Sequence, residues 1–171
     1  MNRKWWVLIT LVLVVLVVYL WPTSRPSFDS LYASAPPDKV AALKAFRAEL
    51  PPAQLEVDGV TWEYLSTGNG EQAILFLHGM TGAYDIWWQQ IAALRGNYRI
   101  VSVTYPAVDS LAELERGVLA ILDQEGVTKF NVVGSSLGGY LAQFLVARHP
   151  ERVSRAVFAN TFPPTTSYKE E

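Results

Sequence analysis

A run of apolar residues near the start of the chain stands apart from everything that follows it. Trp5 to Trp21 contains no charged residue and consists almost entirely of Val, Leu, Ile and aromatic residues. As a helix this run would span roughly 25 Å at ~1.5 Å per residue, enough to cross a bilayer. The alternatives are a buried core helix and a cleaved signal peptide, for which Ala33-Ser34-Ala35 is the candidate cleavage motif. We expect an uncleaved membrane anchor.

The charges that flank this run predict its orientation. Arg3 and Lys4 precede it, whereas Arg25 alone follows it closely. Basic residues tend to remain on the cytoplasmic side of a membrane. We therefore expect a single-pass protein whose N-terminus is cytoplasmic and whose remaining domain lies on the outer side.

The next stretch changes from linker composition to a helical pattern. Pro22 to Pro37 is rich in Pro, Ser and Ala, which is typical of a linker. From Asp38 to Leu50 apolar residues return at helical spacing, and Asp38 is a candidate N-terminal cap. Pro51-Pro52 would end this helix. The apolar face is expected to contain Val40, Leu43, Phe46 and Leu50.

Beyond residue 53, short apolar runs alternate with longer segments of helical periodicity. Asp58-Gly59 between two such runs predicts a hairpin, and Ser110-Leu-Ala-Glu113 is a capping box that opens a helix. We expect strands at 54–57, 60–65, 73–77, 98–104, 128–133 and 153–159, and helices at 84–94, 110–124 and 137–149. This order predicts an α/β fold with a mostly parallel sheet, right-handed crossovers and a site at the carboxyl ends of the strands.

Three regions follow from these patterns. We expect a transmembrane anchor at 1–21, a linker with a short amphipathic helix at 22–53, and one α/β domain at 54–171. A chain of 171 residues has room for a single such domain.

The most informative motif lies between the predicted strand at 128–133 and the helix after it. Gly134-Ser135-Ser136-Leu137-Gly138 has the Gly-x-Ser-x-Gly spacing of a nucleophile elbow. Gly134 and Gly138 would occupy positions where a Cβ clashes with the strand or the turn. The spacing selects Ser136, because Ser135 lacks a glycine two positions to either side. The alternative is a glycine-rich turn without chemistry.

Composition excludes several other functions. The formal net charge is −2 and no basic cluster exists, which argues against a nucleic-acid partner. The absence of cysteine excludes disulfides, thiol catalysis and cysteine-based zinc sites. His78 and His149 are the only histidines, and no carboxylate cluster accompanies them, so we expect no metal. No phosphate loop or dinucleotide fingerprint is present, and we expect no cofactor.

His78-Gly79, the elbow at Ser136 and the order of elements together resemble the α/β-hydrolase superfamily. Within it the sequence is most similar to maspardin and bacterial maspardin-like hydrolases. The resemblance covers roughly residues 46–168 and excludes the membrane segment. The similar stretches are Asp85–Ile91, Tyr98–Val101, Tyr105-Pro106, Gly134–Gln143 and Asn160–Phe162.

This resemblance implies a serine hydrolase that acts on an ester or a related small acyl substrate. Ser136 would be the nucleophile, and the backbone N–H groups of Met80 and Leu137 would form the oxyanion hole. His78 and Gly79 would shape the oxyanion loop, and His78 would not be the general base.

The chain departs from the family where the acid and the base are expected. In this superfamily both follow the nucleophile, after further strands. Asn160 occupies the position where some members place an early acid, and the only later histidine is His149. A helix that begins at the elbow would place His149 about 20 Å from Ser136. We therefore expect His149 to have a structural role.

Without an acid and a base, this chain alone is expected to be inactive, and three interpretations stay open. The first, which we favour, is the N-terminal portion of a serine hydrolase truncated after its sixth strand. The second is a non-catalytic, maspardin-like binding or scaffold protein with a protein partner. The third is a membrane-tethered structural domain.

Overall fold

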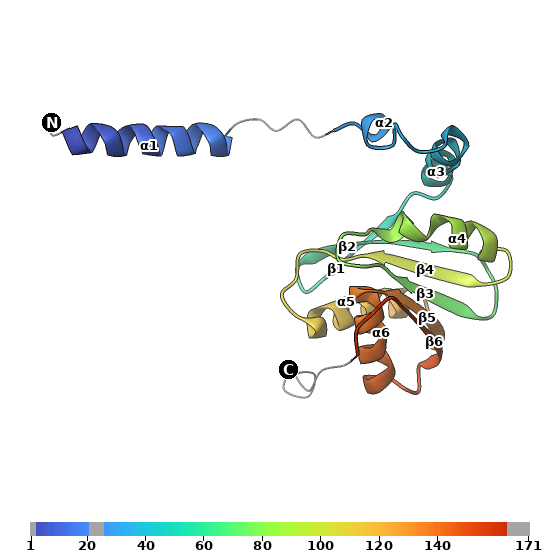
Figure 1. The fold of residues 1–171 in the computed structure, drawn as a ribbon. Helices are drawn as coiled ribbons and strands as arrows, with labels where there is room; N and C mark the ends of the chain where they lie inside the picture. Colours follow the sequence, from blue (N-terminus) through green and yellow to red (C-terminus); the bar gives the residue numbers. More distant parts are fainter. Residues whose placement is uncertain (1–2, 21–25, 164–171) are drawn as a thin grey trace. The chain divides into compact units, whose positions relative to one another are not determined.

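The computed structural model describes residues 3–20 and 26–163. Contacts divide the chain into two units, Met1–Val40 and Ala41–Glu171, and each is described by itself (Figure 1). The first unit contains α1 (Arg3–Leu20) and α2 (Phe28–Leu31). The second contains a six-stranded sheet with its covering helices.

The predicted apolar helix is present as α1. It has 18 residues with a mean hydropathy of 2.0, and none of its residues is buried. At ~1.5 Å per residue its length is about 27 Å, close to the thickness of the hydrocarbon core of a bilayer. The helix is therefore a candidate membrane span by length and composition.

Between this helix and α3 the structure describes one further short helix. Ser27 caps the single turn of α2, accepting a hydrogen bond from the Ser30 N–H at 3.2 Å. Residues 21–25 of the predicted linker lie outside the described residues.

The amphipathic helix is present as α3 (Pro37–Glu49), but its predicted cap is wrong. The helix begins at Pro37, so Asp38 lies inside the first turn and not before it. Proline suits the first helical position because its fixed φ is already helical and no hydrogen bond is lost there. An acidic side chain in the first turn still complements the helix dipole. On the apolar face, Leu43 and Phe46 are buried.

The six strands form one mixed sheet in the order β1-β2-β4-β3-β5-β6. The predicted hairpin pairs β1 with β2, and β2 also pairs antiparallel with β4. The remaining pairs, β4 with β3, β3 with β5 and β5 with β6, are parallel, which confirms the mostly parallel core of the sheet. The strands are β1 (Ala53–Val57), β2 (Val60–Thr67), β3 (Ala73–Leu77), β4 (Arg99–Thr104), β5 (Phe130–Ser135) and β6 (Val153–Ala159).

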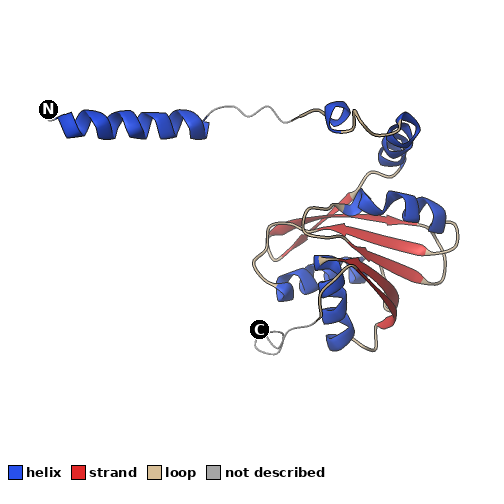
Figure 2. Cartoon of the chain, viewed as in Figure 1, coloured by secondary structure: helices blue, strands red, loops and turns tan. Residues whose placement is uncertain are grey.

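Helices cover both faces of the sheet (Figure 2). One apolar cluster lies between the sheet and the pair α5 (Leu111–Gln124) and α6 (Leu137–Arg148), while a second lies between the other face and α4 (Trp88–Leu94). All five residues of β3 are buried, as expected for a central parallel strand. The predicted helix at 84–94 begins as a separate 3-10 helix, η1 (Tyr84–Trp87).

The capping box at the start of α5 is formed as predicted. The Ser110 hydroxyl accepts a hydrogen bond from the Glu113 N–H at 3.2 Å, and the Glu113 carboxylate accepts one from the Ser110 N–H at 3.0 Å.

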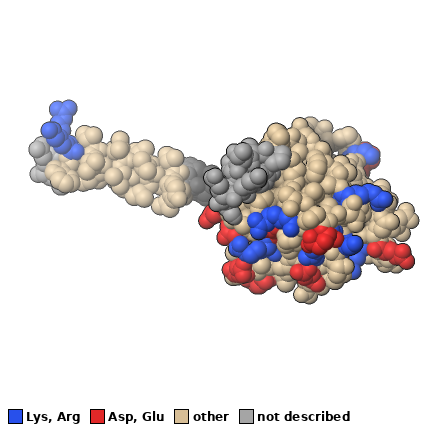
Figure 3. Space-filling model, turned by 90° about the horizontal axis from the view of Figure 1, so that it is seen from below, with Lys and Arg blue, Asp and Glu red and all other residues tan. Residues whose placement is uncertain are grey.

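Basic and acidic side chains are interspersed on the face shown in Figure 3. That distribution agrees with the absence of a basic cluster in the sequence.

The turn between β5 and α6 packs so closely on its neighbours that side chains are excluded at two positions. A Cβ on Gly134 would lie 2.1 Å from the carbonyl oxygen of Gly138. A Cβ on Gly138 would lie 2.3 Å from the carbonyl oxygen of Leu77 and 2.5 Å from that of His78. These neighbours are backbone atoms and cannot rotate away. The start of α6 is therefore in direct contact with the end of β3.

This contact predicts a large effect of a single methyl group. Gly134→Ala and Gly138→Ala are each expected to lower the free energy of unfolding by about 3 kcal/mol or more, because the backbone of the turn must shift. Gly96→Ala is the matched control, because a Cβ at Gly96 meets nothing within 4 Å. It should change stability by no more than about 0.5 kcal/mol. Urea unfolding of the three variants measures the difference, and equal small effects would contradict the packing described here.

Candidate active site

The serine at the apex of the turn has a strained backbone. Ser136 has φ 53° and ψ −119°, a conformation that residues with a side chain rarely adopt. Such a conformation costs about 1–3 kcal/mol and persists only where the surrounding structure enforces it. Here the Ser136 N–H donates to the Ala159 carbonyl at 3.1 Å, and the Thr161 hydroxyl donates to the Ser136 carbonyl at 2.8 Å. The end of β6 thus holds the elbow in place.

The loop after β3 lies directly against this serine. A Cβ on Gly79 would be 3.4 Å from the Ser136 Cβ and 3.9 Å from its hydroxyl oxygen. The structure therefore brings together the predicted oxyanion loop and the predicted nucleophile. Met80 follows Gly79 and is 79% exposed. The roles of the Met80 and Leu137 backbone N–H groups in an oxyanion hole stay predictions.

Both ring nitrogens of His78 are hydrogen-bonded to backbone atoms. Its Nδ1–H donates to the Gly79 carbonyl, and its Nε2 accepts from the Tyr105 N–H at 3.3 Å. The imidazole is buried and stacks on the Tyr105 ring, with 4.0 Å between the ring centroids. Burial lowers the pKa of His78, although the Gly79 carbonyl and the Asp85 charge oppose that shift. A neutral, doubly hydrogen-bonded imidazole supports the loop and leaves no nitrogen for Ser136.

His149 lies at the opposite end of α6, as expected. It caps the helix, and its Nε2 is 2.7 Å from a carboxylate oxygen of Glu115. Arg148 contacts the same carboxylate at 2.9 Å, and the Glu115 side chain is only 6% exposed. Twelve residues of helix at ~1.5 Å each place His149 about 18 Å from Ser136. The histidine therefore joins α6 to α5 and is structural.

The segment after β6 contains a contact that the sequence did not reveal. Asn160 has φ 45°, so the chain turns sharply there. Thr161, the next residue, reaches the Ser136 carbonyl and packs against Gly139, where a Cβ would lie 2.7 Å from the Thr161 Cβ. A threonine in a loop has no distinctive sequence signal, and only the fold shows its partner.

Other contacts fix η1 beside the site. Asp85 is almost fully buried and accepts a hydrogen bond from Arg47 of α3 at 2.5 Å. Thr104 accepts from the Tyr84 N–H at 3.0 Å, and Ser102 donates to the Tyr84 carbonyl at 2.7 Å.

Within residues 3–20 and 26–163, no group of three or more potential metal-ligating side chains is found.

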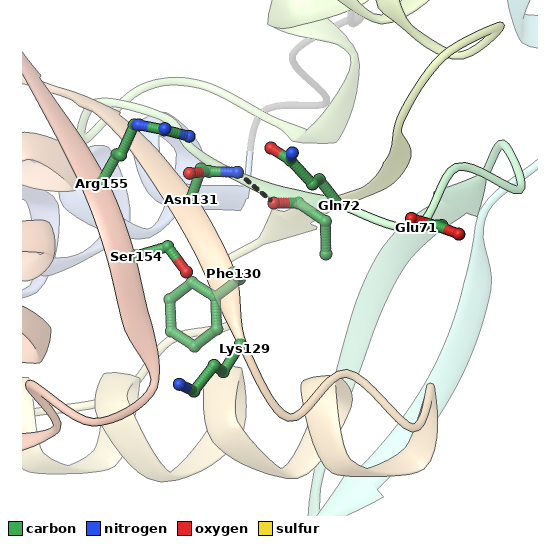
Figure 4. A pocket seen from close by; sticks show the side chains of 8 residues that line it. Glu71, Gln72, Lys129, Phe130, Asn131, Ser154 and Arg155 are labelled. Atoms are coloured by element: carbon green, nitrogen blue, oxygen red, sulfur yellow. Dashed lines mark hydrogen bonds between the residues drawn. The ribbon is translucent and has the colours of Figure 1, made fainter.

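Two cavities of the domain differ in their relation to Ser136. One of about 250 Å³ lies beside the elbow, lined by His78, Gly79, Thr81, Gly82, Ile86, Trp87, Gln90 and Ser135. The other, about 410 Å³, lies at the amino ends of β3, β5 and β6, where Asn131 donates to the Ala73 carbonyl at 3.0 Å (Figure 4). Because it is at the opposite end of these strands from the elbow, the larger cavity is not part of the site. The smaller one is the candidate substrate cavity.

Several known proteins are similar to this chain in sequence or in fold. Maspardin of Danio rerio is 32% identical over 133 residues, covering 73% of this chain and 43% of maspardin. The dihydrolipoyllysine-residue acetyltransferase component of an acetoin cleaving system from Cupriavidus necator is 32% identical over 107 residues, covering 57% of this chain and 29% of that protein. A crystal structure of a hydrolase from Pseudomonas aeruginosa PA01 superposes with a TM-score of 0.60 at 27% identity, covering 70% of this chain and 51% of that one.

This chain spans between 29% and 51% of the length of these relatives. The resemblance to maspardin and to bacterial hydrolases is confirmed. Residues 72–171, more than half of the chain, match the family described as alpha/beta hydrolase fold. With the elbow, the parallel strands and the flanking helices in place, the chain belongs to the alpha/beta hydrolase fold family.

Proposed function

We propose that this protein is a serine hydrolase for esters or related acyl compounds, with Ser136 as the nucleophile. The observation that carries the proposal is the backbone of Ser136, held at φ 53° with the backbone of Gly79 against its side chain. A non-glycine residue in such a conformation is characteristic of functional sites, where strain presents a reactive group. Membership of the family and a hydrolase among the similar structures support this assignment.

In the proposed reaction, the Ser136 hydroxyl oxygen attacks the carbonyl carbon of the substrate. The carbonyl oxygen becomes an oxyanion that the Met80 and Leu137 N–H groups stabilise, and collapse of this intermediate expels the alcohol. Water then releases the acid and regenerates the serine. Leu137 is the first residue of α6, and N–H groups at this end of a helix have no partner within the helix.

The reaction also requires a base that accepts the serine proton and returns it to the leaving alcohol. Among the described residues, the two histidines are engaged elsewhere, His78 with Gly79 and Tyr105 and His149 with Glu115. The base must therefore come from outside residues 3–20 and 26–163. The same observation favours a second candidate function, a non-catalytic binding or scaffold protein similar to maspardin.

A fluorophosphonate probe distinguishes these two functions. The 171-residue chain is expected to turn over no simple ester, because no free histidine is available to Ser136 among residues 3–20 and 26–163. In a longer form that supplies an acid and a histidine, the probe should label Ser136, and Ser136→Ala should abolish the label. Ser135→Ala should keep most of it, because Ser135 belongs to β5 and not to the apex. No label on the folded longer form, or equal loss in both variants, would favour the binding protein.

We further propose that α1 anchors the protein in a membrane, with the N-terminus in the cytoplasm and the domain outside. The helix has no charged residue after Lys4. Its 18 residues have a mean hydropathy of 2.0, which suits the hydrocarbon core of a bilayer.

Carbonate washing of membranes tests the anchor. The full-length chain should remain in the pellet, because peripheral proteins are released and spanning helices are not. Val12→Arg with Val15→Arg should shift the protein to the supernatant, since each charge at the centre of a membrane helix costs about 2.5–3.5 kcal/mol. Release of the unaltered full-length chain would contradict the proposal.

A further inference from the structure

The peptide unit between Gly79 and Met80 determines where the predicted oxyanion donor points. This unit carries the Gly79 carbonyl and the Met80 N–H, and in a planar trans peptide the two groups point in opposite directions. Two donors bind the carbonyl, the Nδ1–H of His78 and the N–H of Gly82, the latter at 3.0 Å. The direction of the Met80 N–H is therefore set by the groups that bind the carbonyl of the same unit.

The other ring nitrogen of His78 keeps its partner only while the imidazole is neutral. Nε2 lies 3.3 Å from the Tyr105 N–H, and a backbone N–H can only donate. In the imidazolium form both ring nitrogens carry a hydrogen, so Nε2–H and the Tyr105 N–H would face each other as two donors. The ring has little room to turn away, because a Cβ on Gly82 would lie only 2.8 Å from its Nδ1. Protonation of His78 should therefore disturb the bond to the Gly79 carbonyl.

One buried charge near His78 favours that protonated form. Burial lowers the pKa of His78, and the charge of Asp85 in η1 opposes this shift. Burial also raises the pKa of the two neighbouring phenols, Tyr84 and Tyr105, so both are neutral where a histidine titrates. The Glu63 carboxylate of β2 acts on Tyr84. Within the described residues, Asp85 is thus the ionised group that acts on the imidazole.

A cation from α3 compensates the Asp85 carboxylate. The Arg47 Nε lies 2.5 Å from Oδ2 of Asp85, and that carboxylate side chain is 11% exposed. Two buried side chains of the same helix, Leu43 and Phe46, fix α3 to the domain, and the Phe46 ring lies 6.4 Å from the Trp88 ring of α4. Partly buried charges are screened much less than exposed ones. The guanidinium therefore offsets a charge that would otherwise act on the loop.

We propose that Arg47 is a positioning residue of the oxyanion loop, on which it acts through Asp85 and His78. By compensating the buried carboxylate, the guanidinium keeps the imidazole neutral and the first carbonyl of the loop bound. This inference rests on the proposed function, because the direction of the Met80 N–H matters for chemistry only if Ser136 attacks a carbonyl. Because α3 precedes residue 72, where the match to the family begins, this contact lies outside the matched residues.

Histidine NMR on the full 171-residue chain in detergent micelles tests the inference. The chain has two histidines, and His149→Gln assigns their signals. In the unaltered chain the ring ¹⁵N signals of His78 should show a neutral imidazole protonated at Nδ1. In Arg47→Met the ratio of protonated to neutral His78 at a given pH should be about tenfold higher, because an uncompensated carboxylate favours the imidazolium. The Met80 backbone amide signal should shift over the same pH range.

Matched variants separate charge from packing. Arg47→Lys keeps the cation and should keep the ratio low. Arg47→Gln keeps a hydrogen-bond donor for Asp85 without the charge, and it should raise the ratio as Arg47→Met does. Glu49→Gln removes a different ion pair of α3, the one with Arg95 at 2.7 Å, and should leave His78 unchanged. The Arg47 side chain is 38% exposed, and thermal melting verifies that each variant folds.

A double variant tests the path through Asp85. Asp85→Asn removes the charge that Arg47 compensates, so the ratio should not exceed that of the unaltered chain. Adding Arg47→Met to Asp85→Asn should then have no further effect on His78, whereas independent effects would add.

Several outcomes would overturn the inference. An unchanged ratio in Arg47→Met and Arg47→Gln would show that the guanidinium does not act on His78. An equal rise in Glu49→Gln would assign the effect to the packing of α3. A Met80 amide signal that did not follow the titration would separate His78 from the loop. Ser136→Ala should leave all of these results unchanged, so a failed nucleophile assignment is distinguishable from a failed role of Arg47.

Discussion

The close approach of the α6 N-terminus to the end of β3 is the constraint on which the rest of the site depends. Gly138 stands where any Cβ would meet the carbonyl oxygens of Leu77 and His78, and Gly134 is equally close to Gly138. This packing forces the intervening chain into a tight turn and gives Ser136 its positive φ. It also brings the loop after β3 against the serine. One backbone contact therefore positions both the candidate nucleophile and the candidate oxyanion loop.

Neither histidine of the described residues is available as a base for Ser136. His78 shapes the loop, where burial lowers its pKa and its ring nitrogens are hydrogen-bonded to the Gly79 carbonyl and the Tyr105 N–H. His149 joins α6 to the buried Glu115 of α5. The described residues thus present a serine and a shaped loop, and the proposed chemistry depends on a base that they do not contain.

Short-range patterns predicted much of this arrangement. The Ser110–Glu113 capping box, the Asp58-Gly59 hairpin and the glycine spacing around Ser136 each encode a structure within a few residues. The sequence did not predict the insertion of β4 between β2 and β3, because strand order depends on distant pairings. The contacts of Thr161 with Ser136, Arg47 with Asp85 and Glu115 with His149 join positions 25, 38 and 34 residues apart. Such pairs leave no local signature. The pattern places the start of α3 one residue too late, because Pro37 itself occupies the first helical position and Asp38 follows it inside the first turn.

Stability measurements on Ser136→Gly test most directly whether the fold holds this serine under strain. Glycine accepts φ 53° without a Cβ penalty, so relief of about 1–3 kcal/mol should outweigh the ~0.5–1 kcal/mol entropic cost of glycine. We predict that Ser136→Gly is at least as stable as the original chain in urea unfolding. Ser135→Gly, in regular β5 backbone, should be less stable by about 1 kcal/mol. If Ser136→Gly were destabilised as much as Ser135→Gly, the serine would not be strained, and the account of this turn as a nucleophile elbow would be contradicted.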